Sequence, residues 1–391
     1  MSGREFEVVV WGATGYTGRL VAEHLLKTYG AAGGLKWAVA GRTAGKIAEV
    51  MAEIGAPPTL PAIVADAADR ASLDLMVRRA DAVITTVGPY QLYGSPLVAA
   101  CAAAGTDYVD LTGESNWIAA MIAENEAAAK ASGARIVFSC GFDSIPFDLG
   151  VFYAEEQAKQ RLGAYVPRVR GRVRRLRGGL SGGTLASGMA TQAAMQKDPS
   201  LGALLADPFA LTPGFKGADQ PDGDHAYDDK VTGSWVGPFM MAGINTKAVH
   251  RTNFLLGQRW GADFQYDEMQ MLDGPPDPAG GGGMGGFDFG AGGMPRPGEG
   301  PAPEERAAGF YDILVIAEAP DGRTVRTAVK GDLDPGYGST SKMLGESAVC
   351  LVRDVPRSAT PGGCWTPASA MGQALIKRLE ANAGLTFTTE T

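Results

Sequence analysis

The sequence is short of the residues that build metal centres and disulfide frameworks. It has four cysteines and three histidines among 391 residues. The cysteines are far apart and form no Cys-x-x-Cys pair, at positions Cys101, Cys140, Cys350 and Cys364. Such spacing argues against a zinc site and favours reduced thiols. The loop 222–229 groups four aspartates around His225, but a lone histidine in a polar loop is usually only solvated. We therefore predict no metal.

Long hydrophobic runs and an excess of positive charge are also missing. No apolar run reaches the ~18 residues that a membrane span needs. The net charge is −8, so the overall charge favours neither nucleic acid nor an anionic membrane surface as a partner. A strand is expected to begin by residue 6, which leaves no room for a signal peptide. We expect a cytoplasmic protein, with peripheral contact to membrane or lipid left open.

The start of the chain carries a dinucleotide-binding motif. Val8-Val9-Val10 predicts a buried strand, a glycine-rich turn follows it, and the pattern from Leu20 to Leu26 indicates an amphipathic helix. Glycines at three-residue spacing permit the tight turn, the approach of a pyrophosphate and the close packing of helix on strand. The free N–H groups at the helix start then face the phosphates. We predict that the cofactor contacts are made by Gly12, Thr14, Gly15, Tyr16, Thr17 and Gly18.

The end of the second predicted strand indicates which dinucleotide binds. A site for NAD would place an acidic residue there, but the strand 35–43 ends in Gly41-Arg42-Thr43. The guanidinium of Arg42 suits a phosphate, so we predict that it binds the 2′-phosphate of NADP. The alternative is an exposed arginine that begins the next helix. Asp66, at the end of the third predicted strand, is expected on the adenine side.

Strand and helix signals alternate through the first third of the chain. Six strands are expected by about residue 140, which predicts an α/β fold with a doubly wound parallel sheet of the Rossmann type. Beyond Gly150 the pattern changes to charged and apolar residues in alternation, and a hairpin is expected over 310–329. We therefore predict an NADP-binding domain over 1–148, a mixed α/β substrate domain over 149–365, and a helix within 366–391 that packs back on the first domain.

The segment 274–300 holds 12 glycines and 5 prolines in 27 residues, too few apolar side chains for a core element. It is predicted to be a flexible loop. The alternatives that remain open are a disordered connector, a lid over an apolar substrate and a membrane contact, the last two through its Met and Phe residues.

Residues after the fourth, fifth and sixth strands should meet at one edge of the sheet, where open α/β sheets bind ligands. Gly88 and Pro89 are expected beside the nicotinamide, and Tyr90 is the predicted proton donor, although tyrosines in such loops commonly only pack. Asp143 and Ser144 are predicted to position the substrate or relay a proton. Further candidates are Tyr93, Asp110, Glu114 and the helix start at Ser181; for Asp110, Asp143 and Ser181, helix or turn capping is the alternative.

A basic run stands out against the acidic whole, with arginines at 168, 170, 172, 174, 175 and 177. The alternation with Val169 and Val173 predicts a half-solvated antiparallel strand. The arginines suit either a solvated sheet face or a docking face for an acidic protein such as an acyl carrier domain. No aromatic residues accompany them as a nucleic-acid site would require.

Together these motifs resemble the saccharopine dehydrogenase-like family, in particular its branch of trans-acting enoyl reductases. The resemblance spans most of the chain. It rests on Gly12–Gly18, Ala40-Gly-Arg42, Thr85–Tyr90, Ala103–Tyr108, Asp110–Glu114, Cys140–Pro146, Ser181-Gly-Gly183 and Thr366-Pro-Ala368. The loop 274–300 departs from the more apolar segment of relatives, which weakens the case for membrane association.

The resemblance implies an NADPH-dependent oxidoreductase that reduces an enoyl thioester in lipid or polyketide synthesis. Its substrate would be an acyl chain, and an acyl carrier domain is the partner considered for it. The alternatives are a saccharopine dehydrogenase-like reductase of an imine or amino acid, and a non-catalytic NADP-binding protein associated with lipid. The acyl chain and the oligomeric state stay open.

Overall fold

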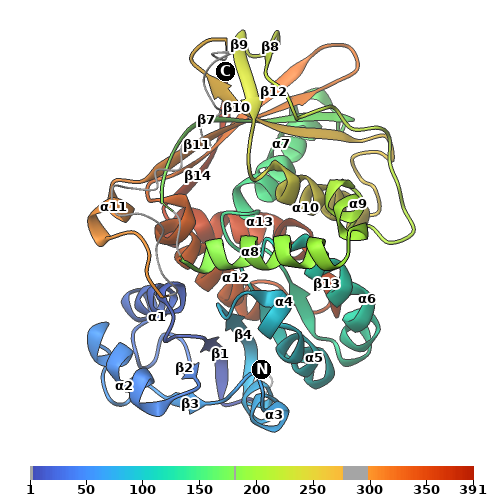
Figure 1. The fold of residues 1–391 in the computed structure, drawn as a ribbon. Helices are drawn as coiled ribbons and strands as arrows, with labels where there is room; N and C mark the ends of the chain where they lie inside the picture. Colours follow the sequence, from blue (N-terminus) through green and yellow to red (C-terminus); the bar gives the residue numbers. More distant parts are fainter. Residues whose placement is uncertain (1–2, 180–181, 276–297) are drawn as a thin grey trace.

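The computed structural model describes residues 3–179, 182–275 and 298–391 (Figure 1). Ser181 and most of the glycine-rich segment 274–300 fall outside these residues, so the predictions made for them stay predictions. Two seven-stranded sheets, called sheet A and sheet B here, are stacked one above the other with helices between them. Among the described residues, no helix is both long enough and apolar enough to span a membrane.

Sheet A is parallel throughout and has the order β13-β6-β5-β4-β1-β2-β3. This confirms the predicted doubly wound sheet, whose order reverses between β1 and β4. A seventh strand, β13, joins the edge from the far end of the chain and was not predicted. The strands are β1 (Phe6–Trp11), β2 (Trp37–Gly41), β3 (Ala62–Val64), β4 (Ala80–Thr85), β5 (Asp107–Val109), β6 (Arg135–Val137) and β13 (Gly363–Trp365).

The two faces of sheet A are covered by different helices. Strand side chains alternate between faces, so Val8 and Val10 belong to one hydrophobic cluster and Val9 to another. The Val9 face packs on α3 (Arg70–Arg78), α5 (Ser95–Ala104) and α6 (Ser115–Ser132). The Val8 face packs on α1 (Tyr16–Tyr29), α2 (Ala44–Glu53) and α12 (Thr340–Arg353).

Sheet B is mixed and has the order β14-β12-β11-β7-β10-β9-β8. The predicted hairpin is present as β11 and β12. The prediction of an antiparallel strand over the arginine run is correct on one side only, because β7 pairs antiparallel with β11 but parallel with β10. The strands are β7 (Arg168–Arg177), β8 (Tyr227–Asp229), β9 (Ser234–Pro238), β10 (Gln265–Leu272), β11 (Phe310–Glu318), β12 (Thr324–Gly331) and β14 (Leu385–Glu390).

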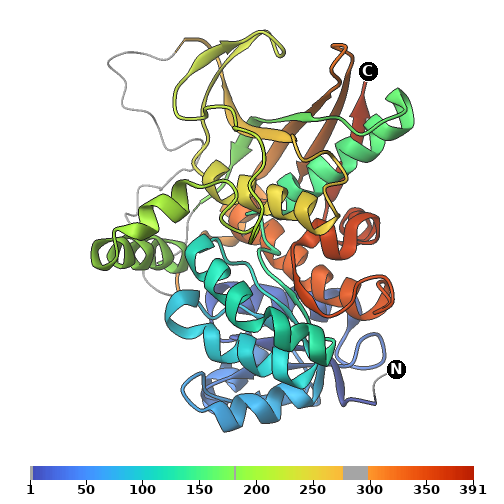
Figure 2. The ribbon, with the colours of Figure 1, turned by 90° about the vertical axis from the view of Figure 1, so that its right-hand side faces the viewer.

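Helices α7 (Ile145–Leu162), α10 (Ala242–Leu255) and α13 (Pro367–Asn382) fill the space between the sheets (Figure 2). One hydrophobic cluster runs from Val8 and Val10 of sheet A through α12, α13 and α7 to Val315 and Val329 of sheet B. The two sheets therefore share a continuous core. The remaining helical segments lie outside this core. They are α4 (Tyr90–Tyr93), α8 (Gly182–Lys197), α9 (Ser200–Ala206), α11 (Pro303–Ala307) and the π-helical turn η1 (Pro335–Ser339).

The last third of the chain returns to both sheets. Helix α13 begins at Pro367 with Thr366 as its N-cap, as predicted, since the Thr366 hydroxyl accepts from the Ser369 N–H. It packs against α12, α7 and α10, and β14 then adds to the edge of sheet B. The domain limits at 148 and 365 stay a prediction. However, α12 and β13, both within 149–365, pack with sheet A.

Candidate functional site

The loop between β1 and α1 has three glycines in three different environments. Gly12 has a φ of +88°, and a Cβ on it would lie 2.7 Å from Cγ2 of Val87. A Cβ on Gly18 would lie 2.1 Å from the carbonyl oxygen of Gly12, so the helix can approach the turn only with glycine there. A Cβ on Gly15 would lie 3.4 Å from the Gly12 carbonyl oxygen, an ordinary contact, and the residue is exposed. The open glycine is therefore the one predicted to face the pyrophosphate.

Helix α1 begins at Tyr16 with Gly15 as its N-cap, and no side chain of the described residues caps it. The N–H groups of its first turn, which includes Thr17, are thus left for an anion. The side chain of Tyr16 turns away from this position, because its hydroxyl donates to the carbonyl of Pro301 and accepts from Nη1 of Arg306 at 2.9 Å. Tyr16 therefore contributes backbone to the predicted site, while its ring holds the segment after the glycine-rich loop.

Arg42 is exposed directly after β2, and among the described residues no carboxylate pairs with it. Thr14 lies beside the same strand end, with its Cγ2 3.3 Å from a Cβ built on Gly41. The glycine loop and the strand end that carries Arg42 are thus neighbours, as a dinucleotide with a 2′-phosphate requires. Asp66 is exposed after β3, and its carboxylate accepts from the Ala68 N–H at 3.0 Å. This contact is a local turn, and the adenine role of Asp66 stays a prediction.

A buried carboxylate fixes the backbone of the segment that follows β4. Glu114 accepts the N–H groups of Tyr90 at 2.9 Å and of Gln91 at 2.8 Å, which fixes the start of α4. Gly88 and Pro89 precede this turn, and a Cβ on Gly88 would lie 3.8 Å from the Ser187 hydroxyl of α8. The predicted nicotinamide position is therefore flanked by α4 and α8.

The Tyr90 side chain points into the protein. It is 5% exposed, and its hydroxyl donates to the carbonyl of Thr85 at 3.0 Å. Burial and the nearby Asp110 raise the pKa of Tyr90 well above its usual value. The role of Tyr90 as proton donor stays a prediction, and in this structure the hydroxyl makes a contact within the core. Tyr93 is half exposed, at 50%.

Asp110 holds the fifth strand to its neighbours. Its carboxylate accepts from the Tyr108 hydroxyl at 2.9 Å and from the N–H groups of Ser139 and Thr112, at 2.8 and 3.1 Å. Burial raises the pKa of Asp110 to about 7 against these hydrogen bonds. The carboxylate closes turns at the carboxyl edge of sheet A, which is the capping alternative considered for it.

Asp143 and Ser144 follow β6 at the same edge. Asp143 is a half-buried residue, and desolvation of its carboxyl group raises its pKa to about 6. A Cβ on Gly113 would lie 3.0 Å from Oδ2 of Asp143, so the glycine leaves room for this carboxyl group. The Ser144 hydroxyl is buried, with no hydrogen-bond partner among the described residues. At this edge, the Asp143 carboxyl and the Ser144 hydroxyl are therefore the predicted polar groups that a ligand can still reach.

A buried carboxyl group on sheet B is not among the residues predicted from the sequence. Glu268 of β10 is 1% exposed, and desolvation raises its pKa well above the usual value. It accepts hydrogen bonds from the Asn245 amide at 2.9 Å and the Tyr266 hydroxyl at 3.0 Å. The signal in the sequence was Tyr266-Asp-Glu-Met269, where two acids stand together between large apolar or aromatic residues.

The arginines of β7 are largely paired with acids on other strands of sheet B. Arg170 pairs with Glu318 at 3.1 Å, and Arg174 pairs with Glu390 at 2.6 Å. Arg172 is fully buried and pairs with Asp229 and Asp267, both at 2.7 Å, and Arg168 also pairs with Asp267. This face is therefore an ion-pair network rather than a simply solvated surface. Arg175 and Arg177 are the exposed members of the run.

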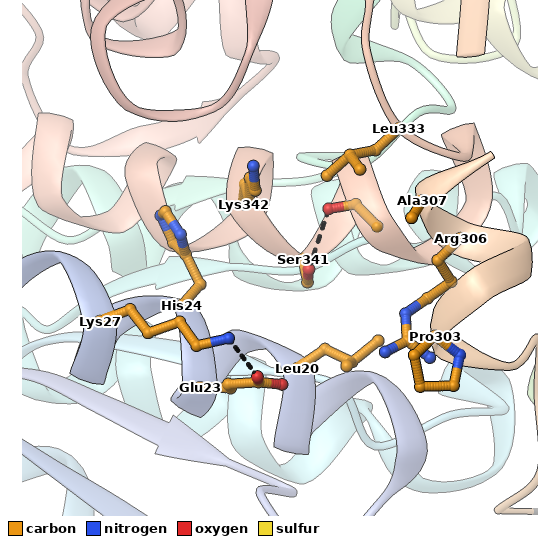
Figure 3. Close-up of a pocket in the computed structure, with 11 residues that line it drawn as sticks. Leu20, Glu23, His24, Lys27, Pro303, Arg306, Ala307, Leu333, Ser341 and Lys342 are labelled. Carbon is orange, nitrogen blue, oxygen red and sulfur yellow. Dashed lines mark hydrogen bonds and ion pairs between the residues drawn. The ribbon is translucent and has the colours of Figure 1, made fainter. Parts of the chain in front are cut away.

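A separate pocket of about 210 Å³ lies between α1, α11 and α12 (Figure 3). Lys27 and Glu23 form an ion pair of 2.5 Å on its wall, and Arg306, which holds Tyr16, faces it from α11. None of the lining residues belongs to the predicted site. Within the described residues, no group of three or more His, Cys, Asp or Glu side chains is placed to hold a metal ion.

Comparisons with known proteins agree with this geometry. Residues 8–137 match the family model described as the saccharopine dehydrogenase NADP binding domain. The chain is 38% identical to a Mycobacterium tuberculosis protein provisionally named a trans-acting enoyl reductase, over 99% of this chain and 98% of that protein. It is 35% identical to the trans-acting enoyl reductase of Mycobacterium leprae, with 96% of each chain covered.

Among solved structures, the apo saccharopine dehydrogenase (L-Glu forming) of Saccharomyces cerevisiae aligns with 99% of this chain and 100% of its own. The TM-score is 0.55 and the identity 14%, so this likeness concerns the fold alone.

Proposed function

Because the chain belongs to the saccharopine dehydrogenase-like family, in the branch of the trans-acting enoyl reductases, it is an NADP-dependent oxidoreductase, and we propose that it reduces the carbon–carbon double bond of an enoyl thioester. The observation that carries this proposal is the similarity to relatives with that name over nearly the whole chain, at 38% identity. A likeness confined to the cofactor domain would have supported only the cofactor.

An uncharged reacting group is consistent with the edge of sheet A. A dicarboxylate amino acid such as saccharopine calls for cationic side chains in its site. The cations of α10 are already bound to backbone carbonyls: Lys247 to Leu205 and Gly243, and Arg251 to Leu211 and Cys364. The polar groups that remain at the edge, on Asp143 and Ser144, can serve a proton transfer but not the binding of two carboxylates.

The residues of this chain would hold and align the two reactants. When bound, NADPH supplies the hydride that adds to the β-carbon of the double bond. The glycine loop around Gly15 and the Arg42 guanidinium would fix the cofactor, and α4 and α8 would confine the acyl group beside it. The α-carbon then needs one proton. The reaction therefore calls for a single acid at the edge of sheet A, without a metal or a nucleophile.

Asp143 fits the acid role better than Tyr90. The Tyr90 hydroxyl already donates to Thr85 in the core, whereas Asp143 is half-buried and burial raises the pKa of its carboxyl group to about 6. A carboxyl group with a pKa in this range gives up a proton readily near neutral pH. We therefore propose Asp143 as the proton donor and retain Tyr90 as the alternative.

The test is NADPH oxidation by the purified protein with enoyl thioesters, saccharopine and simple imines as substrates. We expect turnover with enoyl thioesters and identification of the saturated acyl product by mass spectrometry. Turnover with saccharopine or imines alone would favour the amino-acid reductase. NADPH binding with no turnover on any substrate would favour a non-catalytic protein associated with lipid.

Two variants separate the acids. Asp143→Asn is expected to lower turnover by about 10²-fold or more with unchanged NADPH affinity. Tyr90→Phe keeps the ring and loses one buried hydrogen bond, so it should cost about 1 kcal/mol of stability and little turnover. The reverse result would make Tyr90 the donor.

We propose that the acyl chain is presented on a carrier domain, because an enzyme that acts in trans receives its substrate from another protein. We also propose that the product enters lipid or polyketide synthesis. Comparison of kcat/KM for one enoyl chain on a carrier domain and on a short pantetheine thioester tests this point. Equal values would argue against recognition of the carrier.

A further inference from the structure

The pocket between α1, α11 and α12 is lined by more positive than negative charge (Figure 3). Each helix contributes one cationic side chain: Lys27 from α1, Arg306 from α11 and Lys342 from α12. Of the described residues that line the pocket, one is an acid, Glu23, and its carboxylate is already paired with Lys27 at 2.5 Å. Two positive charges in the lining, those of Arg306 and Lys342, are therefore not balanced by an acid of the lining.

Lys342 is placed where the helix itself disfavours a cation. It is half-buried in the first turn of α12, and it forms no ion pair with any of the described residues. The N-terminus of a helix carries a partial positive charge, so a lysine in the first turn is repelled by the helix dipole. The first turn of α12 has no acidic residue to offset this repulsion. An anion bound in the pocket would offset it.

Arg306 also has donors to spare. Among the described residues its side chain donates only through Nη1, to the Tyr16 hydroxyl at 2.9 Å and to the Pro301 carbonyl at 2.8 Å. A guanidinium group has five N–H donors in a planar fork, so the donors on Nε and Nη2 are still available. Such a fork suits a carboxylate or a phosphate.

Asp334 lies beside Arg306 but does not neutralise it. The N–H of Asp334 donates to the Arg306 carbonyl at 2.9 Å. The buried carboxylate of Asp334 is used by the turn η1, because it accepts the N–H groups of Gly336, Tyr337 and Gly338 at 3.1, 3.3 and 2.6 Å. The guanidinium of Arg306 is therefore left for a group from outside the described chain.

The remainder of the wall and the volume indicate the size of that group. Apolar side chains line the pocket beside the cations, from Leu20, Pro303, Ala307 and Leu333. The volume is about 210 Å³, and a cavity of about 150 Å³ can hold benzene. An inorganic anion would leave the apolar side chains in contact with water, whereas an anion on a small apolar group would also cover them. The pocket therefore suits a small organic anion.

Arg306 connects the pocket to the cofactor loop. Tyr16, whose hydroxyl accepts from Arg306, is the first residue of α1, in the turn predicted to hold the pyrophosphate. The Tyr16 ring also packs edge-on against Tyr337, with ring centroids 5.2 Å apart. A Cβ on Gly300 would lie 2.5 Å from Cε1 of Tyr16, so the segment that precedes α11 fits closely on this ring. An anion that fixed Arg306 would thereby fix Tyr16 and the start of α1.

From this geometry we propose that the pocket is a regulatory site, in which a small organic anion binds to Arg306 and Lys342 and strengthens the binding of NADPH. A first ligand that orders a binding loop reduces the entropy that the second ligand must lose on binding. The coupling is reciprocal, so bound NADPH strengthens the binding of the anion by the same factor. The inference needs only the NADPH site and does not depend on the acyl substrate proposed above.

Benzoate and phenyl phosphate are suitable probes, because each joins an anion to a ring that the pocket can hold. Isothermal titration calorimetry of the full chain with NADPH, with and without a saturating probe, measures the coupling. We expect the better probe to lower the Kd for NADPH about fivefold, and the comparison of the two shows whether carboxylate or phosphate is preferred. Benzyl alcohol lacks the charge and inorganic phosphate lacks the ring, so both should have a smaller effect. A probe bound at Arg42 instead would compete with NADPH and raise its Kd.

The variant Lys342→Met removes the charge and keeps most of the side-chain stem. We expect it to raise the Kd for the probe about tenfold, at the lower end for the loss of a charged contact, and to leave the Kd for NADPH alone unchanged. Lys377→Met is the matched control. Lys377 also lies on a helix, α13, forms no ion pair with the described residues and does not line the pocket. Its replacement should leave the Kd for the probe at the wild-type value.

The variant Tyr16→Phe tests the connection to the cofactor. It keeps the ring but cannot accept a hydrogen bond from Arg306, so the probe should still bind while its effect on the Kd for NADPH disappears. Coupling that survived in Tyr16→Phe would overturn the route through Arg306. Failure of both probes to bind the wild-type protein, equal binding to Lys342→Met, or a Kd for NADPH that neither probe lowers would each overturn the regulatory site.

Discussion

Replacement of Arg42 by alanine should separate NADPH from NADH. The side chain is exposed, and among the described residues it has no carboxylate partner, so its removal costs the fold little. A hydrogen bond to a charged group contributes about 1.5 to 3 kcal/mol, and an exposed site belongs at the lower end. We therefore expect about 1.5 to 2 kcal/mol, or about a 10- to 30-fold rise in the Kd for NADPH.

Isothermal titration calorimetry of wild type and Arg42→Ala with each cofactor measures this difference. The Kd for NADH should stay within about twofold of its wild-type value, since NADH has no 2′-phosphate. Arg42→Lys is the matched control, because it retains the charge but loses the planar fork, and it should recover part of the affinity. Equal weakening of both cofactors, or an unchanged Kd for NADPH, would refute the role of Arg42.

Two further predictions concern stability. Gly18→Ala places a methyl group 2.1 Å from the Gly12 carbonyl oxygen, so we expect a loss of about 2 kcal/mol or more in unfolding free energy, measured by denaturant titration, and weaker NADPH binding. For Glu346, desolvation opposes ionisation, but hydrogen bonds from His24 and Tyr29 outweigh it, and its pKa lies below 4.5. The ionised Glu346 carboxylate therefore stabilises the folded state above pH 4.5, and this stabilisation is lost as the pH falls through the pKa of Glu346 in the folded protein. Thermal melts should decline less on acidification in Glu346→Gln than in wild type; parallel declines would contradict this.

The parts of the fold that could be predicted have local signals. The glycine spacing, the apolar strands and the capping by Thr366 each depend on residues within a few positions of one another. The edge at which Asp110 and Asp143 lie also followed from the alternation of strands and helices.

The rest depends on contacts between distant parts of the chain. Strand β13 has three residues, too few for a periodic pattern, and it pairs with β6 more than 200 positions earlier. The parallel partner of β7 could not be read from its own alternation, which is the same for both pairings. The burial of Arg172 and Glu268 depends on neighbouring strands in the same way.

The chain order of sheet A has a consequence for how the molecule can be divided. Its edge strand β13 and one of its covering helices, α12, come after nearly all of sheet B in the sequence. The strands of sheet B from β7 to β12 are therefore inserted between the strands of sheet A, and α13 and β14 follow at the chain end. A fragment that stops at residue 148 would lack both the edge strand and the α12 cover, leaving Val8 and Val10 partly open to solvent. An excision that kept the cofactor domain whole would have to remove the middle of the chain and rejoin its two ends.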